Sequence, residues 1–165
     1  MRTIDNINSL NKSEFLSIFG NVFEKTESVA LKVFQLKPFK DFDDIISKML
    51  KIYEEYDRDK ILEILNSHPE LAIEKKLTID SKLEQTSANL NECSEEEFKE
   101  FRKLNIEYKT KFGFPFIIAV KGKNKNEILV NFRERIKNDL NKEFFEAKIQ
   151  VKKIACFRLE DILSI

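Results

Sequence analysis

The chain contains a single histidine, His68, which lies in the segment SHPELA at residues 67–72. Imidazole is the side chain whose ordinary pKa lies near neutrality, so proton transfer by an unperturbed side chain near pH 7 falls to His68. Proline is favoured at the first position of a helix. We therefore expect a helix to begin at Pro69, with His68 as its N-cap beside the positive helix end. A histidine in this position can also be a structural cap without a chemical role.

A second group that can handle protons is the carboxylate of Glu84, in the segment SKLEQTSANL at residues 81–90. Ser81 stands three positions before Glu84, and this spacing is that of a capping box, in which the two side chains close the start of a helix. On this pattern alone, capping is favoured over catalysis. Both roles are compatible if the box holds Glu84 at the start of a helix.

Arg135 is one of only six arginines among 29 basic residues. The planar guanidinium offers two parallel hydrogen bonds to a carboxylate or a urea oxygen, a geometry that lysine does not match. Its neighbours Arg133 and Glu134 leave a second interpretation open, in which Arg135 is a solvated ion-pair residue on the surface of a helix.

The segment FGFPFIIAV at residues 112–120 interrupts the helical pattern. Gly113 is suited to end a helix, and Pro115 prevents its continuation. The apolar, partly β-branched residues that follow are expected to be extended and buried. Buried extended backbone has N–H and C=O groups that need partners, and a bound ligand can supply them. A core-filling turn is the alternative, because the chain has 15 phenylalanines.

The elements that position these groups are predicted to be helices. Three glycines and three prolines in 165 residues leave few points at which helices break. Cap residues followed three positions later by glutamate mark helix starts at Asn11, Ser94 and Asn124. Apolar residues recur at helical spacing in four stretches, 15–23, 42–53, 98–112 and 128–136. One long helix is expected from Glu143 to Leu163.

We therefore expect an all-α protein with a single domain over residues 1–165. Its architecture would be a bundle of roughly seven to nine helices with one extended FGFPFIIAV segment.

Composition limits the possible partners. The chain has 29 Lys and Arg residues against 29 Asp and Glu residues, and a net charge of zero argues against binding dominated by nucleic-acid phosphates. Cys93 and Cys156 form neither a disulfide framework nor a metal-ligand pattern, so no metal is expected. The apolar run at 114–120 is too short to span a bilayer, and the N-terminus lacks the apolar core of a signal peptide. We expect a cytoplasmic protein without nucleic-acid or membrane partners.

Taken together, several segments resemble one family, the 2-oxo-4-hydroxy-4-carboxy-5-ureidoimidazoline (OHCU) decarboxylases of urate degradation. The segments are HPELA at 68–72, SKLEQTSANL at 81–90, LNIEYKTKFGFPFIIAV at 104–120, EIL at 127–129, RIKN at 135–138 and RL at 158–159. Looser matches stand at 19–24 and 37–39. Each piece alone is weak, whereas HPEL, SxxEQ and FGFPF in this order are specific.

The resemblance implies a cofactor-free, all-helical and usually dimeric enzyme, a carbon–carbon lyase that converts OHCU to (S)-allantoin with loss of carbon dioxide. It implies that His68 and Glu84 form the central catalytic pair and that Arg135 contacts the substrate. The implied substrate-binding residues are Pro69, Ser81, Gln85, Phe116, Ile117, Ile118 and Ala119.

This chemistry suits those residue types. Decarboxylation leaves an electron pair that the C=N and carbonyl groups of OHCU can delocalise, so neither a pyridoxal or thiamine cofactor nor a metal is required. The protein must orient the carboxylate, stabilise the developing charge and deliver one proton. His68 suits the proton transfer, Glu84 would orient its ring or the substrate hydroxyl, and Arg135 would bind a substrate oxygen.

Three positions depart from the family pattern: the loop at 73–80 is short and polar, Glu27 and Ser28 stand where relatives often have Pro-Trp, and Asn89 stands where glycine is common. The first two favour a second hypothesis, a non-catalytic helical interaction module that keeps the scaffold. The joint presence of the proposed site residues favours the enzyme.

Overall fold

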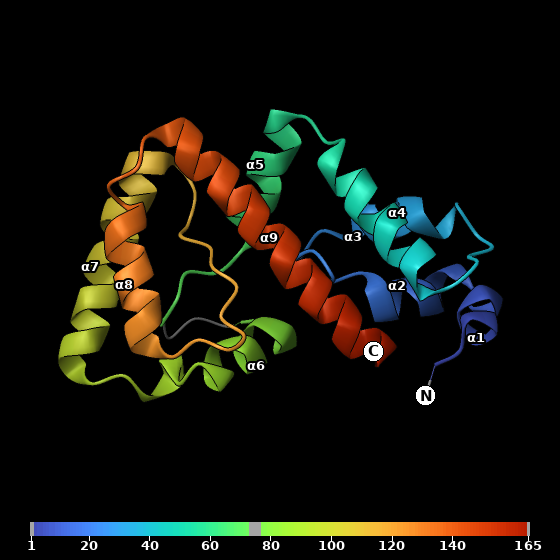
Figure 1. Ribbon diagram of the computed structural model, residues 1–165, viewed down its shortest axis with the longest axis horizontal. Helices are drawn as coiled ribbons and strands as arrows, with labels where there is room; N and C mark the ends of the chain where they lie inside the picture. The colour runs from blue at the N-terminus through green and yellow to red at the C-terminus, as the bar shows by residue number, and fades with distance from the viewer. Residues whose placement is uncertain (1, 73–76, 165) are drawn as a thin grey trace. The chain divides into compact units, whose positions relative to one another are not determined.

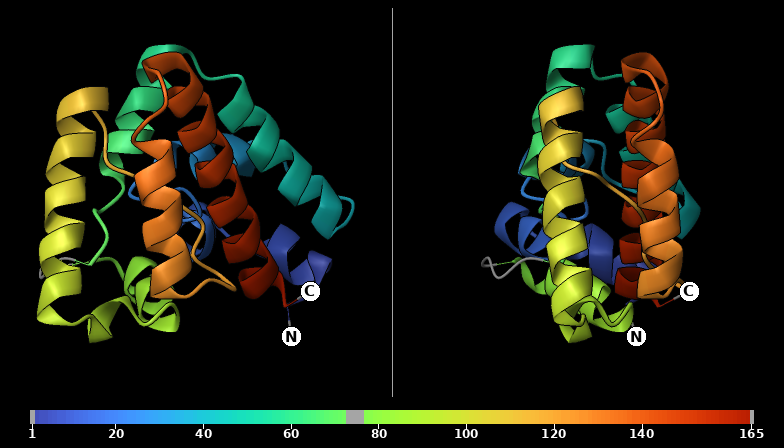
Figure 2. Two further views of the ribbon diagram at one scale, coloured as in Figure 1. Left: turned by 60° about the vertical axis from the view of Figure 1, so that its left-hand side comes forward. Right: turned by 90° about the vertical axis from the view of Figure 1, so that its left-hand side faces the viewer.

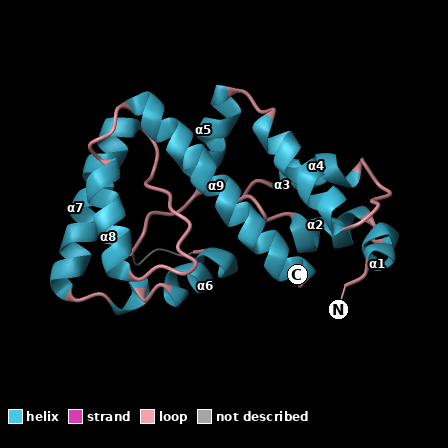
Figure 3. Ribbon diagram, viewed as in Figure 1, coloured by secondary structure: helices cyan, strands magenta, loops and turns pink. Residues whose placement is uncertain are grey.

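The computed structural model describes residues 2–72 and 77–164, and in these ranges it contains helices and no strand (Figure 3). The helices are α1 (Ile4–Ser9), α2 (Lys12–Phe19), α3 (Glu27–Phe34), α4 (Phe42–Glu54), α5 (Arg58–Ser67), α6 (Ile79–Ser87), the 3-10 helix η1 (Leu90–Glu92), α7 (Glu95–Phe112), α8 (Lys125–Arg135) and α9 (Leu140–Leu163). The all-α prediction is confirmed. No helix in the described ranges is long and apolar enough to cross a membrane. Half of the short loop at 73–80 lies outside the described residues.

The chain divides into two compact units. One comprises residues 1–67 and 152–165, and the other comprises residues 68–151, so that α9 contributes to both. Every residue proposed for the site, from His68 to Arg135, belongs to the second unit. The geometry of the site can therefore be described within that unit alone.

Local sequence signals set several helix ends as predicted. Complete capping boxes start α2 at Asn11, α7 at Ser94 and α8 at Asn124. Gly113 ends α7 with φ of 79°, a left-handed conformation that glycine adopts without steric cost. The predicted C-terminal helix is present as α9, which begins at Leu140, three residues before Glu143.

Helices α7 and α8 form the frame of the second unit. They lie side by side, and the irregular segment that joins them runs back along their length (Figures 1 and 2). This segment is fully buried from Phe114 to Val120, as predicted. Its Phe116 ring stacks on Phe132 of α8 at 3.9 Å between centroids, and Tyr108 of α7 packs edge-on against both rings. Aromatic packing thus holds this segment in place, although the segment is part of neither a helix nor a sheet.

Two predicted helix starts are wrong. His68 is not an N-cap, because it follows Ser67, the last residue of α5, and residues 69–72 are not helical. The residue before a proline is disfavoured in the helical region, so Pro69 ended a helix rather than beginning one. Ser81 is not an N-cap either: Thr78 caps α6 and accepts a hydrogen bond from the backbone N–H of Ser81. Ser81 and Glu84 therefore lie within α6, and capping no longer explains Glu84.

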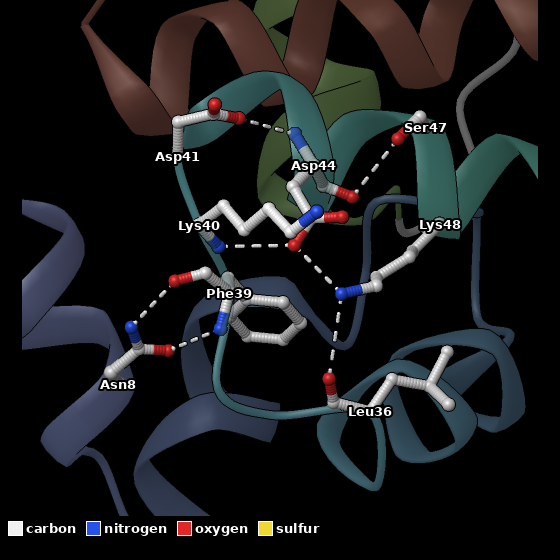
Figure 4. A network of polar contacts seen from close by, with 8 residues as sticks. All are labelled: Asn8, Leu36, Phe39, Lys40, Asp41, Asp44, Ser47 and Lys48. Carbon is white, nitrogen blue, oxygen red and sulfur yellow. Dashed lines mark hydrogen bonds and ion pairs between the residues drawn. The ribbon is translucent and has the colours of Figure 1, made fainter.

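The first unit shows how polar side chains organise a turn before a helix (Figure 4). Asn8 holds both backbone groups of Phe39, since its amide donates to the carbonyl and accepts from the N–H, each at 2.8 Å. Asp44 of α4 accepts hydrogen bonds from the backbone N–H of Lys40 at 3.0 Å and from the ammonium of Lys48 at 2.7 Å. The hydrogen bond from Lys48 is the main cause that lowers the pKa of Asp44 from its ordinary 3.8.

This contact predicts a specific acid sensitivity. Because the folded-state pKa of Asp44 lies below the unfolded value, its stabilising contribution is present above about pH 3.8 and is lost as the pH falls through the folded pKa. Asp44→Asn should therefore make the free energy of unfolding fall less steeply below about pH 4. Urea unfolding at a series of pH values measures this. Asp43→Asn, in the same helical turn, is the control, and equal acid slopes for Asp44→Asn and the wild type would contradict the prediction.

Candidate active site

His68 lies at the carboxyl end of α5, and its side chain is buried. The residue is 8% exposed, and its Nε2 atom is shielded from solvent. His68 follows the last residue of α5, so the expectation that it caps the N-terminus of a helix is wrong.

The backbone after His68 is held by side-chain amides. Gln85 of α6 accepts a hydrogen bond from the N–H of Ala72 at 3.1 Å and donates one to the carbonyl of Glu70 at 3.2 Å. Asn105 of α7 donates to the carbonyl of Leu71 at 2.9 Å. Ala72 has φ of 52°, a left-handed conformation rare for residues other than glycine. Residues 70–72 therefore follow a path that other elements impose.

The predicted α6 residues share a helical face. Ser81 and Gln85 stand four positions apart and are both buried, and Glu84 between them is half-buried. Gln85 uses its oxygen and one N–H on the 70–72 backbone, and its second N–H has no partner in the described part of the chain. The pairing of His68 with Glu84 stays a prediction.

Arg135 lies in a buried cluster around the carboxylate of Glu143. Its Nε and Nη2 donate to Glu143 Oε1 at 2.8 and 2.5 Å, and Tyr108 donates to the same oxygen at 2.5 Å. Asn138 donates to Oε2 at 2.9 Å, and Nη1 of Arg135 donates to the carbonyl of Ile117 at 2.6 Å. Arg135 is therefore not the solvated surface residue that one interpretation of the sequence allowed. Among the residues that the structure describes, three of its five N–H groups are engaged, and two have no partner there.

The segment 116–119 is held partly by protein. The carbonyl of Ile117 receives Arg135, and the N–H of Ala119 donates to Gln150 Oε1 at 2.9 Å. The Arg135 guanidinium also lies 4.5 Å from the centre of the Phe116 ring. Within the described ranges, the backbone groups of Phe116 and Ile118 make no hydrogen bond, although both residues are buried. Buried N–H and C=O groups need hydrogen-bond partners, and this is the property that the sequence predicts for the segment.

Tyr108 and Glu143 form the support of this cluster. Burial, followed by the hydrogen bond to Glu143, raises the pKa of Tyr108 well above its ordinary value of 10. The phenol is therefore protonated at neutral pH and can only donate to the carboxylate. With Tyr108, both Arg135 groups and Asn138 as donors, the fully buried Glu143 is satisfied on both oxygens.

Sequence reasoning did not single out Glu143, Asn105 or Gln150 as site residues. A signal did exist for Asn105: the buried face of α7 consists of Phe101, Leu104, Asn105, Tyr108 and Phe112, and Asn105 is the polar residue on that apolar stripe. No comparable local pattern marks Glu143, because its partners lie up to 35 residues away. The described contacts join the 70–72 and 116–119 segments through α7, which supplies both Asn105 and Tyr108.

Removing the Glu143 charge should destabilise the protein. Glu143→Gln leaves the Arg135 guanidinium buried without its counter-ion, and breaking a buried pair in this way costs about 3–5 kcal/mol. Chemical denaturation measures the loss. The matched control is Glu134→Gln, which removes an exposed pair with Lys137 and should cost less than about 1 kcal/mol. Similar losses for the two variants would show that the buried cluster does not support the fold.

Comparison with known proteins gives extensive matches. The chain is 38% identical over 162 residues to the uric acid degradation bifunctional protein of Bacillus sp. (strain TB-90), and the match covers 98% of this chain and 32% of that protein. It is 33% identical over 162 residues to the 2-oxo-4-hydroxy-4-carboxy-5-ureidoimidazoline decarboxylase of Haloferax volcanii, covering 98% of this chain and 96% of the relative. The chain thus spans about a third of the bifunctional relative and nearly all of the Haloferax volcanii one.

The fold agrees with a solved structure. The crystal structure of an (S)-allantoin synthase matches with a TM-score of 0.78 at 25% identity, covering 98% of this chain and 54% of that chain. In addition, residues 8–160 match the family model of OHCU decarboxylase. A match over this length, together with a relative of the same extent at 33% identity, places the sequence unambiguously. The chain belongs to the OHCU decarboxylase family.

Proposed function

We propose that this protein catalyses the cofactor-independent decarboxylation of OHCU to (S)-allantoin in urate degradation. The observation that carries the proposal is the Haloferax volcanii relative bearing this name, 96% of whose length the match covers. The burial of His68, Gln85 and Arg135 within one unit adds support, because polar side chains are seldom buried unless they have polar partners or a function.

In this proposal His68 transfers the proton. Its Nε2 atom is shielded from water, so a proton exchanged with the substrate through this atom would not be lost to bulk solvent. Glu84, half-buried on α6, orients the ring or the substrate hydroxyl, with the buried Ser81 on the same face. Pro69 fixes the chain direction directly after His68, because its ring locks φ.

Arg135 and the 116–119 segment form the other side of the proposed substrate site. The two remaining N–H groups of Arg135 would bind a substrate carboxylate or urea oxygen, and Glu143 would hold the guanidinium at a fixed angle. The backbone groups of Phe116 and Ile118, which make no hydrogen bond within residues 2–72 and 77–164, would pair with the ureido or ring amide atoms of OHCU. An amide-rich substrate matches such alternating donors and acceptors.

Three further expectations belong to this proposal: a single functional domain, a cytoplasmic location and a homodimer. The family match at 8–160 includes residues of both compact units, which supports one domain. The exposed aromatic ring of Phe145 and the exposed Ile149, one turn apart on α9, are compatible with a protein contact. Light scattering on the purified protein measures the oligomeric state.

The decisive assay generates OHCU in place from urate, with a urate oxidase and the preceding hydrolase, and follows the optical activity of the product. Rapid formation of (S)-allantoin is the expected result. Slow racemic allantoin at the uncatalysed rate would refute the enzyme and favour the alternative, a non-catalytic helical interaction module.

His68→Asn should reduce kcat/KM by about 10²- to 10⁴-fold, because general acid–base catalysis contributes on this scale. Far-UV circular dichroism checks that the helices are retained. Near wild-type turnover in a folded His68→Asn protein would remove His68 from the mechanism while leaving the family assignment intact.

Arg135→Lys tests whether the arginine contacts the substrate. Loss of one charge-assisted hydrogen bond of about 1.5–3 kcal/mol predicts a fall in kcat/KM of about 10- to 150-fold. Arg133→Lys is the control on the same helix, since Arg133 is exposed and pairs with Glu100. Steady-state kinetics measures both variants. Reduced stability with unchanged kinetics in Arg135→Lys would assign Arg135 to the scaffold alone.

A further inference from the structure

The segment that carries His68 has no secondary structure of its own after α5. Pro69 has no N–H to donate, so the segment depends on partners from elsewhere. Gln85 binds the carbonyl of Glu70 and the N–H of Ala72, and Asn105 binds the carbonyl of Leu71 between them. Each of these three consecutive residues is therefore held by a side-chain amide of another element.

Asn105 is poorly suited to a purely structural role. It is 2% exposed and lies on the apolar stripe of α7, next to Leu104 and one turn before Tyr108. Its Oδ1 atom is buried and has no hydrogen-bond partner within residues 2–72 and 77–164. An unsatisfied buried acceptor opposes folding, so the Oδ1 atom of Asn105 brings no stability of its own. The part of Asn105 that finds a partner is Nδ2, which donates to Leu71.

We propose that Asn105 is a positioning residue of the active site, which fixes the path of residues 68–72 by holding the Leu71 carbonyl. Its kinetic consequence rests on the proposed decarboxylase function, whereas its effect on the environment of His68 does not. Displacing a reacting group by about 1 Å reduces turnover by about 100-fold, so a residue remote from the substrate can act strongly on the rate.

The test uses Asn105→Leu in the full chain. Because His68 is the only histidine, isotope labelling of histidine gives a single set of ring resonances that reports on this residue alone. The expected result is a shifted or broadened His68 ring resonance, together with a fall in kcat of about 10- to 100-fold and a KM changed by less than about threefold. Both are measured well below the unfolding temperature. Asn105→Ser, whose hydroxyl is too short to reach the same carbonyl, replaces it if the leucine variant does not fold.

The matched control is Asn8→Leu. Asn8 also binds a backbone carbonyl through its Nδ2, but its partner is Phe39 in the other unit. This variant should lose stability and keep the His68 resonance and kcat of the wild type, whereas a general effect of lost stability would alter both variants alike.

A His68 resonance in the folded Asn105 variants that superimposes on the wild type would overturn the proposal. If the wild-type chain does not turn over OHCU, the proposed function fails, and the resonance still decides the role of Asn105. If turnover is normal in the wild type and in Asn105→Leu, the proposed function stands and the positioning role is refuted.

Discussion

The buried carboxylate of Glu143 is the interaction on which the second unit depends. A charge in the core is tolerated only when donors surround it, and here they come from Tyr108, Arg135 and Asn138. The carboxylate fixes the guanidinium, and the guanidinium in turn fixes the carbonyl of Ile117. A residue outside the predicted substrate contacts therefore determines the shape of one wall of the proposed site.

Helix α7 supports both segments of the proposed site, 70–72 and 116–119. Asn105 and Tyr108 stand three positions apart on its buried face, and one holds the 70–72 segment while the other holds Glu143. Both walls are irregular segments that cannot satisfy their own backbone groups. Side chains on regular helices satisfy some of those groups, whereas those of Phe116 and Ile118 make no hydrogen bond within the described residues.

Features set by local chemistry were predictable from sequence. The capping boxes at Asn11, Ser94 and Asn124 and the glycine end of α7 formed as expected, because each depends on residues within one turn. Proline is an ambiguous signal, because it can occupy the first position of a helix or can end the helix before it. At Pro69 the sequence predicts a helix start, whereas the proline follows a helix end.

The support of the site was not predictable in the same way. Asn105 and Leu71 are 34 residues apart, and Tyr108 and Glu143 are 35 apart, so no periodicity within a helix links them. Family resemblance suggests roles for His68, Glu84 and Arg135, whereas only the folded chain brings together the buried network around Arg135 and the side-chain amides that bind residues 70–72.

Ala72 gives this arrangement a mutational consequence. An alanine in the left-handed region raises the energy of the folded state by roughly 1–2 kcal/mol, because its Cβ crowds the backbone. Glycine or asparagine at position 72 would lower this conformational energy, and a β-branched residue would raise it further. Substitutions at position 72 can therefore change the stability and the local rigidity of the segment. The position lies four residues after His68, and such substitutions alter no group that is proposed to react.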